Sequence, residues 1–139
     1  MILLDTNVVS ELMRAAPERS VEEWVATRQD EDLFITAITE AELRYGAALL
    51  PTGKRRTLLV EAIEAMLRED FRGRVVPFDS AAAIAFAQVA AERRQAGKPI
   101  AHADAQIAAI ARSRNALLAT RNVSDFVGCG VQVVNPWTS

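Results

Sequence analysis

The sequence predicts one three-layer α/β domain over residues 1–139, with a mainly parallel central sheet flanked by helices. Short apolar runs that suit buried strands alternate along the chain with longer segments of helical periodicity. The chain has 139 residues, of which 50% are hydrophobic, so it is long enough and apolar enough to bury a core. No repeat, low-complexity tract or linker divides it. In a sheet of this kind, ligands bind beyond the carboxyl ends of the strands.

In the first half of the chain, each helix begins or ends at a recognisable signal. Three N-cap residues at 5–7 follow the first apolar run, and Pro17 ends the helix that they open. A Pro-Thr-Gly turn at 51–53 separates two later helices, the second of which has apolar residues at amphipathic spacing. The expected elements are strands at 2–4 and 33–36, a helix ending before residue 17, and helices at 18–28, about 39–50 and 54–71.

The second half continues the alternation of strands and helices. A proline in the apolar run at 75–78 indicates a strand at the end or edge of the sheet. Asp79 or Ser80 caps an alanine-rich helix that runs to about residue 95, and a Gly-Lys-Pro turn follows at 97–99. The remaining expected elements are a helix at 101–113 and strands at 116–119 and 131–134.

Composition narrows the chemistry that the chain can support. One cysteine, Cys129, cannot form an internal disulfide, and with one histidine a Cys/His zinc site is excluded. Any metal would therefore be held by oxygen atoms. No apolar run approaches the roughly 20 residues of a membrane span, and the N-terminus lacks the basic region of a signal peptide. We expect a cytoplasmic protein without membrane contact.

Charge is distributed unevenly along the chain. Residues 1–50 carry 10 acidic and 4 basic residues, whereas residues 51–139 carry 8 acidic and 12 basic residues. The acidic part favours a cation or a basic partner, and the basic part is compatible with a phosphate backbone. Arginine outnumbers lysine 14 to 2, which favours bidentate recognition of phosphate or carboxylate. A GC-rich genome is the alternative explanation for the arginine excess.

Three carboxylates occupy positions where helix and strand patterns do not favour acids. Asp5 directly follows the first buried strand and so lies at the carboxyl edge of the sheet. Glu42 has no basic residue three or four positions further along its helix, and Asp104 lies on the same apolar helical face as Ile107. The alternatives are a helix N-cap for Asp5, an intrahelical ion pair for Glu42 and a favourable first-turn acid for Asp104.

If these carboxylates converge, their charge must be compensated. Two unit charges ~4 Å apart repel by about 4 kcal/mol at an effective dielectric of 20, so the group requires protons, an arginine or a bound cation. Hard oxygen ligands select Mg²⁺ or Mn²⁺. Mg²⁺ retains several waters and is commonly bound by one or two carboxylates together with substrate phosphates. The pattern therefore predicts metal-assisted phosphoryl chemistry.

Several motifs occur in one order along the chain: Asp-Thr-Asn at 5–7, Ala-Glu-Leu-Arg-Tyr-Gly at 41–46, Ala-Asp-Ala-Gln-Ile-Ala-Ala at 103–109, Ala-Thr-Arg-Asn-Val-Ser-Asp-Phe at 119–126 and Val-Asn-Pro-Trp at 134–137. Together they resemble the PIN-domain ribonucleases, and among these the VapC-type toxins of bacterial toxin–antitoxin pairs. The last motif is similar to the FitB-like subgroup. The resemblance covers essentially the whole chain.

The resemblance implies an Mg²⁺- or Mn²⁺-dependent endoribonuclease that hydrolyses RNA phosphodiester bonds and leaves 5′-phosphate and 3′-hydroxyl ends. Three positions match the catalytic and metal-binding acids of the family: Asp5, Glu42 and Asp104. Many members carry a fourth acid where this chain has Asn122, which leaves the second metal position in question. Asp125, three residues further on, is a second candidate for an additional metal or water ligand, and a turn residue is the alternative for it.

The resemblance assigns one further group of residues, and metal-assisted phosphoryl chemistry suggests another. Polar side chains that would orient the acids or waters are Thr6, Asn7 and Thr120. Candidate phosphate contacts are Arg93, Arg94 and Arg121, for which simple solvent exposure is the alternative.

The resemblance also implies partners: an RNA substrate and a co-encoded VapB/FitA-like antitoxin whose tail fills a groove and reaches the acids. It further implies that the protein forms a homodimer and that it joins the antitoxin in a larger complex that binds operator DNA. An alternative function is a PIN-fold binding module that acts with its partner on DNA and has weak or no nuclease activity, because Asn122 adds no charge to the metal site. A phospho-acceptor receiver domain is disfavoured, since no lysine ends a late strand.

Overall fold

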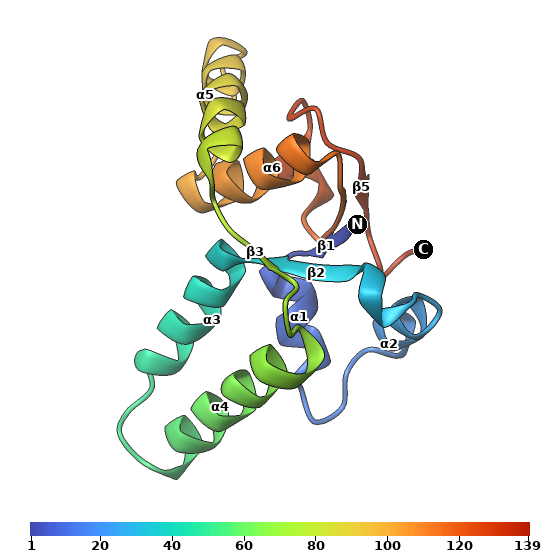
Figure 1. Ribbon diagram of the computed structural model, residues 1–139, viewed down its shortest axis with the longest axis vertical. Helices are drawn as coiled ribbons and strands as arrows, with labels where there is room; N and C mark the ends of the chain where they lie inside the picture. The colour runs from blue at the N-terminus through green and yellow to red at the C-terminus, as the bar shows by residue number, and fades with distance from the viewer.

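The computed structural model describes residues 1–139 and contains a five-stranded sheet in the order β3-β2-β1-β4-β5. Every pair of neighbouring strands is parallel, and the first strand of the chain lies in the middle of the sheet (Figure 1). The strands are β1 (Ile2–Leu4), β2 (Leu33–Thr36), β3 (Val75–Val76), β4 (Leu117–Ala119) and β5 (Val133–Val134).

Helices cover both faces of this sheet. The α-helices are α1 (Thr6–Leu12), α2 (Arg19–Ala26), α3 (Ala37–Ala48), α4 (Lys54–Ala65), α5 (Ser80–Gln95) and α6 (His102–Arg114). Three shorter helical turns are η1 (Asp30–Asp32), the π-helical η2 (Met66–Asp70) and η3 (Val123–Phe126). Figure 1 shows α5 and α6 together on one side of the sheet, with α1 to α4 on the other. No helix is both long enough and apolar enough to cross a membrane.

The core is divided by the sheet into two apolar clusters. Leu4 and Ile35 point to the cluster formed with α1 to α4, whereas Leu3 and Leu118 point to the cluster formed with α5 and α6. Successive residues of a strand face opposite sides, so a short apolar strand supplies both clusters. The predicted three-layer α/β architecture with a parallel sheet is confirmed.

The predicted elements agree with the structure except at some boundaries. The helix expected from about residue 39 begins at Ala37, because the hydroxyl of Thr36 accepts a hydrogen bond from the backbone N–H of Thr39 at 3.1 Å and caps it. The helix expected over 54–71 is α-helical only to Ala65 and then widens into the π-helical turn. The apolar spacing does not distinguish these two helix types.

The parallel arrangement places the ends of three strands beside one another. Ile2 pairs with Leu33 on one side and with Leu117 on the other. The residue after β1, Asp5, therefore lies between the end of β2 and Thr120, which follows β4. This edge carries the site described next.

Candidate active site

A polar pocket of about 530 Å³ opens at this edge of the sheet. The structure brings the three acids predicted from the sequence together in its wall, although they come from positions far apart in the chain. The lining residues are Asp5, Thr6, Asn7, Ser10, Glu11, Arg14, Glu42, Asp104, Arg121, Asn122 and Trp137.

Asp5 is the most firmly held of these acids. It is buried, and it caps α1 because its Oδ1 accepts a hydrogen bond from the backbone N–H of Thr6 at 2.8 Å. Its Oδ2 accepts from the hydroxyl of Thr120 at 2.7 Å and from the Asn7 amide at 3.4 Å. Asp5 is thus both the N-cap of the helix and a wall residue of the pocket.

Glu42 reaches the pocket from α3, where it is exposed. The hydroxyl of Thr6 donates to its Oε1 at 2.7 Å and lies 3.1 Å from the hydroxyl of Thr39. Glu40, two residues earlier, instead pairs with Arg44 at 2.8 Å on the surface. The hydrogen bond from Thr6 therefore orients Glu42, and not Glu40, toward the pocket, and it links α1 to α3.

Asp104 enters from the first turn of α6, on the other side of the sheet. Burial raises its pKa to about 6, and the charges of Asp5, Asp125 and Glu42 act in the same direction. Only the charge of Arg93 lowers this pKa. Asp104 thus lies half-buried in a field of negative charge.

The pKa of Asp5 is also raised, mainly by burial. Hydrogen bonds from Thr120 and Thr6 lower it, while the charges of Glu42 and Asp125 raise it. Burial is the largest cause for both residues and the neighbouring carboxylates add to it, so both acids lie in a desolvated and negatively charged environment. Such a pocket attracts a cation.

The donor set fits a hard divalent cation that keeps part of its water shell. The acids that could hold it, Asp5, Glu42 and Asp104, offer only oxygen ligands. No three His, Cys, Asp or Glu side chains approach closely enough to form a complete metal cage. Mg²⁺ needs only one or two carboxylates with waters and substrate oxygens in the remaining positions, so the open arrangement fits Mg²⁺ or Mn²⁺.

The polar side chains around Asp5 form one connected network. Asn7 donates to the hydroxyl of Thr120 at 3.3 Å, and its Oδ1 accepts from the backbone N–H of Arg121 at 3.2 Å. The same Thr120 hydroxyl accepts from the backbone N–H of Asn122 at 3.1 Å. This network fixes the carboxylate of Asp5 relative to the segment that follows β4.

Asn122 and Asp125, the two candidates for an additional ligand, lie in different places. Asn122 lines the pocket, whereas Asp125 is an exposed residue of η3 and does not line it. Asp125 nevertheless acts on the pocket through its charge, which raises the pKa values of both Asp5 and Asp104.

Of the three arginines proposed as phosphate contacts, only Arg121 lines the pocket. Arg93 donates to the backbone carbonyls of Asp125 and Lys98, both at 2.7 Å, and so holds two loops together. Arg94 is exposed on α5 outside the pocket. The structure therefore gives Arg93 a different set of partners from the one expected from the sequence.

Four lining residues were not predicted: Ser10, Glu11, Arg14 and Trp137. A signal for one of them was present, because Ser10 lies four residues after Thr6 and so shares a helical face with it. Arg14 lies beyond the end of α1. Trp137 reaches the pocket because β5 pairs with β4, and no local pattern reveals that pairing.

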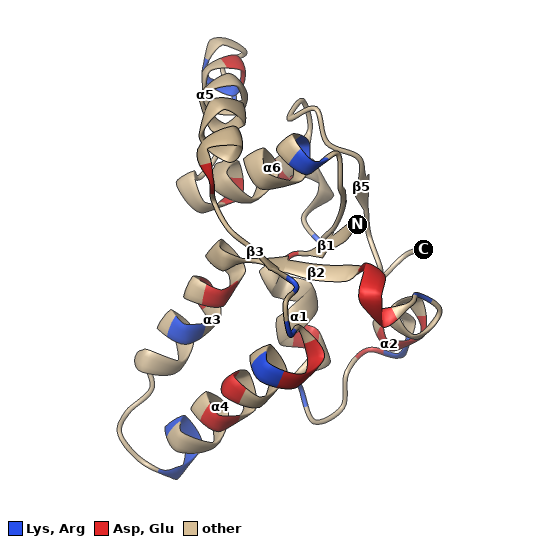
Figure 2. Cartoon of the chain, viewed as in Figure 1, with Lys and Arg blue, Asp and Glu red and all other residues tan.

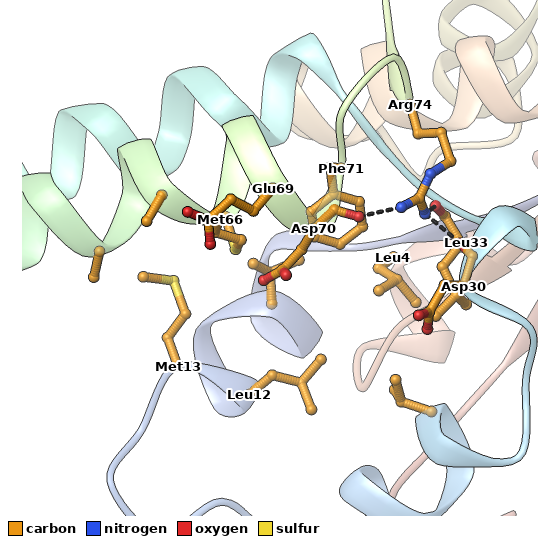
Figure 3. A pocket seen from close by; sticks show the side chains of 14 residues that line it. Leu4, Leu12, Met13, Asp30, Leu33, Met66, Glu69, Asp70, Phe71 and Arg74 are labelled. Atoms are coloured by element: carbon orange, nitrogen blue, oxygen red, sulfur yellow. Dashed lines mark hydrogen bonds between the residues drawn. The ribbon is translucent and has the colours of Figure 1, made fainter.

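A second cavity of about 500 Å³ lies on the α1 to α4 side of the sheet (Figure 3). Of its 14 lining residues, 10 are hydrophobic, including Leu12, Met13 and Met66. Three acidic residues from η1 and η2 border it and are labelled in Figure 3: Asp30, Glu69 and Asp70. Figure 2 shows acidic segments just before β2 and beyond the end of α4. Arg74 closes one end by donating to the backbone carbonyls of Asp30, Leu33 and Asp70. The wall of this cavity, called the apolar cavity below, is therefore mainly hydrophobic, with acidic residues at its edge.

Comparison with known proteins gives concordant matches. A family model described as PIN domain matches residues 2–126. The chain is 44% identical over 137 residues to the VapC ribonuclease Y4jK of Sinorhizobium fredii, which covers 99% of this chain and 98% of that protein. It is also 44% identical to the toxin FitB of Neisseria gonorrhoeae, with 99% of both chains covered. The structure of FitAB bound to an IR36 DNA fragment matches at a TM-score of 0.91 and 43% identity, covering 99% of this chain and 96% of that one.

Proposed function

The chain belongs to the PIN-domain family and, within it, to the VapC- and FitB-like toxins, and on that premise we propose that it is an Mg²⁺- or Mn²⁺-dependent endoribonuclease. The observation that carries the proposal is the pocket that Asp5, Glu42 and Asp104 all line. The charges of neighbouring carboxylates add to burial in raising the pKa values of Asp5 and Asp104, and this mutual repulsion favours a divalent cation in the pocket.

When bound, a divalent cation supplies an activated water and stabilises charge on the phosphoryl and leaving oxygens. The side chains of the protein hold the carboxylates in fixed orientations for this chemistry. Thr120 and the backbone N–H of Thr6 fix the two oxygens of Asp5, and the hydroxyl of Thr6 fixes Glu42. Asp104 completes the group from the opposite face of the sheet. The scissile phosphate would lie against this wall of carboxylates.

The proposal is tested by incubating partner-free protein with total cellular RNA in Mg²⁺, in Mn²⁺ and in EDTA. We expect cleavage at a limited number of sites in either metal, and none in EDTA or with Asp104→Asn or Asp5→Ala. Glu40→Gln is the matched control, because Glu40 lies two residues from Glu42 but pairs with Arg44 on the surface. Cleavage by Asp104→Asn at the wild-type rate would refute the proposal.

A second function is favoured by one residue of the pocket. Asn122 is neutral where many members of the family carry an acid, so the pocket holds one charge fewer. The alternative is a PIN-fold binding module that acts with an antitoxin on DNA and cleaves RNA weakly or not at all. If folded protein cleaves no RNA in either metal, this alternative is supported, and Asn122→Asp is then the variant in which to look for restored cleavage.

We also propose that a VapB/FitA-like antitoxin inhibits the protein by occupying the apolar cavity and extending to the acidic pocket. An amphipathic segment with basic residues complements both surfaces, since the cavity has an acidic border and a guanidinium can neutralise the carboxylates in place of a metal. The matching complex, FitAB bound to DNA, supports an assembly that contacts operator DNA. Loss of inhibition on replacing the basic residues of the antitoxin tail tests this partner.

A homodimer is the remaining part of the proposal. Tyr45 on α3 and Leu49, the C-cap of that helix, are 66% and 65% exposed, and Leu58 on α4 is 54% exposed. Large apolar side chains grouped in this way favour burial against another protein surface. Sedimentation of the partner-free protein beside Leu49→Glu tests whether this surface joins two copies of the chain.

A further inference from the structure

The polar pocket contains a contact between an arginine and an aromatic ring that the proposed chemistry does not use. Trp137 is the only hydrophobic residue among the 11 that line the pocket. The guanidinium carbon of Arg121 lies 5.1 Å from the centroid of its ring, which is a cation–π arrangement. A cationic group is therefore held in the wall that also carries the three acids.

The pairing of the last two strands brings these residues together. Ala119 and Val134 are register partners, and Arg121 and Trp137 follow them by two and three residues. The backbone N–H of Trp137 donates to the Asn135 side chain at 2.9 Å, and the ring packs against the core on the α1 to α4 side. The ring is thus a fixed support for the guanidinium.

The charge of Arg121 has no partner of opposite sign. None of the seven ion pairs in the protein includes it, although three carboxylates line the same pocket. Arg14, the other arginine of the pocket, pairs with the buried Glu11 at 3.0 Å. A stacked, unpaired guanidinium keeps its donors available and matches a phosphate bidentately. Arg121 is therefore the cation of the pocket that is free to meet an anion.

We propose that Arg121 is a preformed contact for a backbone phosphate of RNA next to the scissile bond, and that Trp137 is the residue that positions it. This inference rests on the proposed ribonuclease function. It assigns the tryptophan to holding a cation, so its ring is not a platform for a base. A phosphate contact fixes the register of the strand and adds affinity without reading sequence.

The role of Arg121 is tested by the binding of a fluorescein-labelled, mixed-sequence RNA oligonucleotide to the full-length protein in EDTA, followed by anisotropy over a range of salt. Arg121→Gln is expected to weaken binding about tenfold and to reduce the slope of log affinity against log salt by about 1. Arg94→Gln removes the same charge from an exposed position outside the pocket and is expected to change neither quantity. Equal losses in the two variants would overturn the proposal.

The role of Trp137 is tested by a double-mutant cycle. Trp137→Leu is expected to weaken binding about two- to fivefold, whereas Trp137→Phe retains an aromatic face and is expected to bind nearly as tightly as wild type. In the Arg121→Gln background, Trp137→Leu should have no further effect, because no guanidinium remains to be positioned. A loss of the same size in both backgrounds would show that Trp137 acts through the fold alone and would overturn its positioning role.

Failure of this inference is distinguishable from failure of the proposed function. If wild-type protein cleaves RNA and Arg121→Gln binds RNA as tightly as wild type, the proposed phosphate contact of Arg121 is refuted and the proposed ribonuclease function is retained. If wild-type protein cleaves no RNA in either metal while Arg121→Gln still weakens RNA binding, the phosphate contact of Arg121 is retained and the proposed ribonuclease function is refuted.

Discussion

Individual residues in this pocket combine structural and chemical roles. Asp5 caps α1 and also forms part of the pocket, so the two interpretations of it from sequence are compatible. Asp5, Glu42 and Asp104 could be selected from sequence because acids are unusual at those positions. Arg93 could not be interpreted in the same way, since two of its partners, the backbone carbonyls of Asp125 and Val127, lie more than 30 residues away in the sequence. Sequence reveals a charged residue but not which carbonyls surround it.

At the residue scale, the first prediction concerns Asp104 and pH. Its pKa is about 6 in the folded protein and close to 3.8 when unfolded, so the folded state binds the proton more tightly. Ionisation of Asp104 therefore destabilises the metal-free protein: the cost is absent below about pH 4, grows as pH rises and is complete above about pH 6. Asp104→Asn should raise the free energy of unfolding by about 1 kcal/mol at neutral pH. This value is smaller than the full pKa shift implies, because solvent screens the half-exposed side chain.

Denaturant unfolding in EDTA at neutral pH and at about pH 4 measures this difference. At the lower pH, the free energies of unfolding of Asp104→Asn and wild type should differ little. At neutral pH, added Mg²⁺ should raise the free energy of unfolding of wild type more than that of the variant. A wild-type protein that is more stable than Asp104→Asn at neutral pH in EDTA would contradict the assignment.

The second prediction concerns Thr120, which holds Asp5 through a hydrogen bond of 2.7 Å in the buried part of the pocket. Thr120→Val keeps the shape of the side chain and removes the donor, so Asp5 loses a fixed orientation. We expect cleavage to slow by about 10- to 100-fold, measured as kcat on an RNA substrate. Thr57→Val is the matched control, because that exposed hydroxyl donates only to the carbonyl of Gly53. Equal rates for the two variants would exclude a role for Thr120.

At the scale of elements, the helices and strands were predictable and their contacts were not. The cap at Asp79 and the strand at 33–36 are local signals, and the structure confirms them. Pro17 does not end the first helix, because α1 already ends at Leu12. The π-helical turn η2 has no distinct signal, since its apolar spacing continues that of α4. The helical turn η3 has no such signal either, because four residues between two loops carry too little periodicity.

The third prediction concerns the loop that contains η3. Arg93, on α5, donates to the backbone carbonyls of Asp125 at 2.7 Å and of Val127 at 3.1 Å. Arg93→Gln removes both bonds, so local opening of residues 125–129 should become easier by about 1 to 3 kcal/mol. Hydrogen exchange of these amides measures the change, and Arg94→Gln is the neighbouring control. Unchanged exchange in Arg93→Gln would show that these bonds do not hold the loop.

At the scale of the whole molecule, the strand order decides what the pocket contains. Residues 5 and 120 are joined by a hydrogen bond across 115 positions of sequence because β1 pairs with β4. Periodicity predicts that strands exist and that they are parallel, but several strand orders satisfy the same pattern. Trp137 and Arg121 depend on the β4–β5 pairing in the same way.

The fourth prediction separates the two cavities, which lie on different parts of the molecule. Val25 lines the apolar cavity and none of the polar pocket. Val25→Glu should therefore weaken inhibition by the antitoxin at least tenfold, because an uncompensated charge would enter an apolar interface. Ile84→Glu, at an exposed site on α5 outside that cavity, should leave inhibition unchanged. Full inhibition of Val25→Glu would place the antitoxin elsewhere.

The most direct test of the central claim is the chemical identity of the RNA ends. Hydrolysis in which water attacks phosphorus and displaces the 3′ oxygen leaves a 5′-phosphate on one fragment and a 3′-hydroxyl on the other. We therefore predict that fragments made by partner-free protein in Mg²⁺ ligate to an adapter that requires a 5′-phosphate, and that they vanish with Asp104→Asn. Fragments with 5′-hydroxyl and cyclic phosphate ends, formed equally in EDTA, would contradict metal-dependent hydrolysis at these three carboxylates.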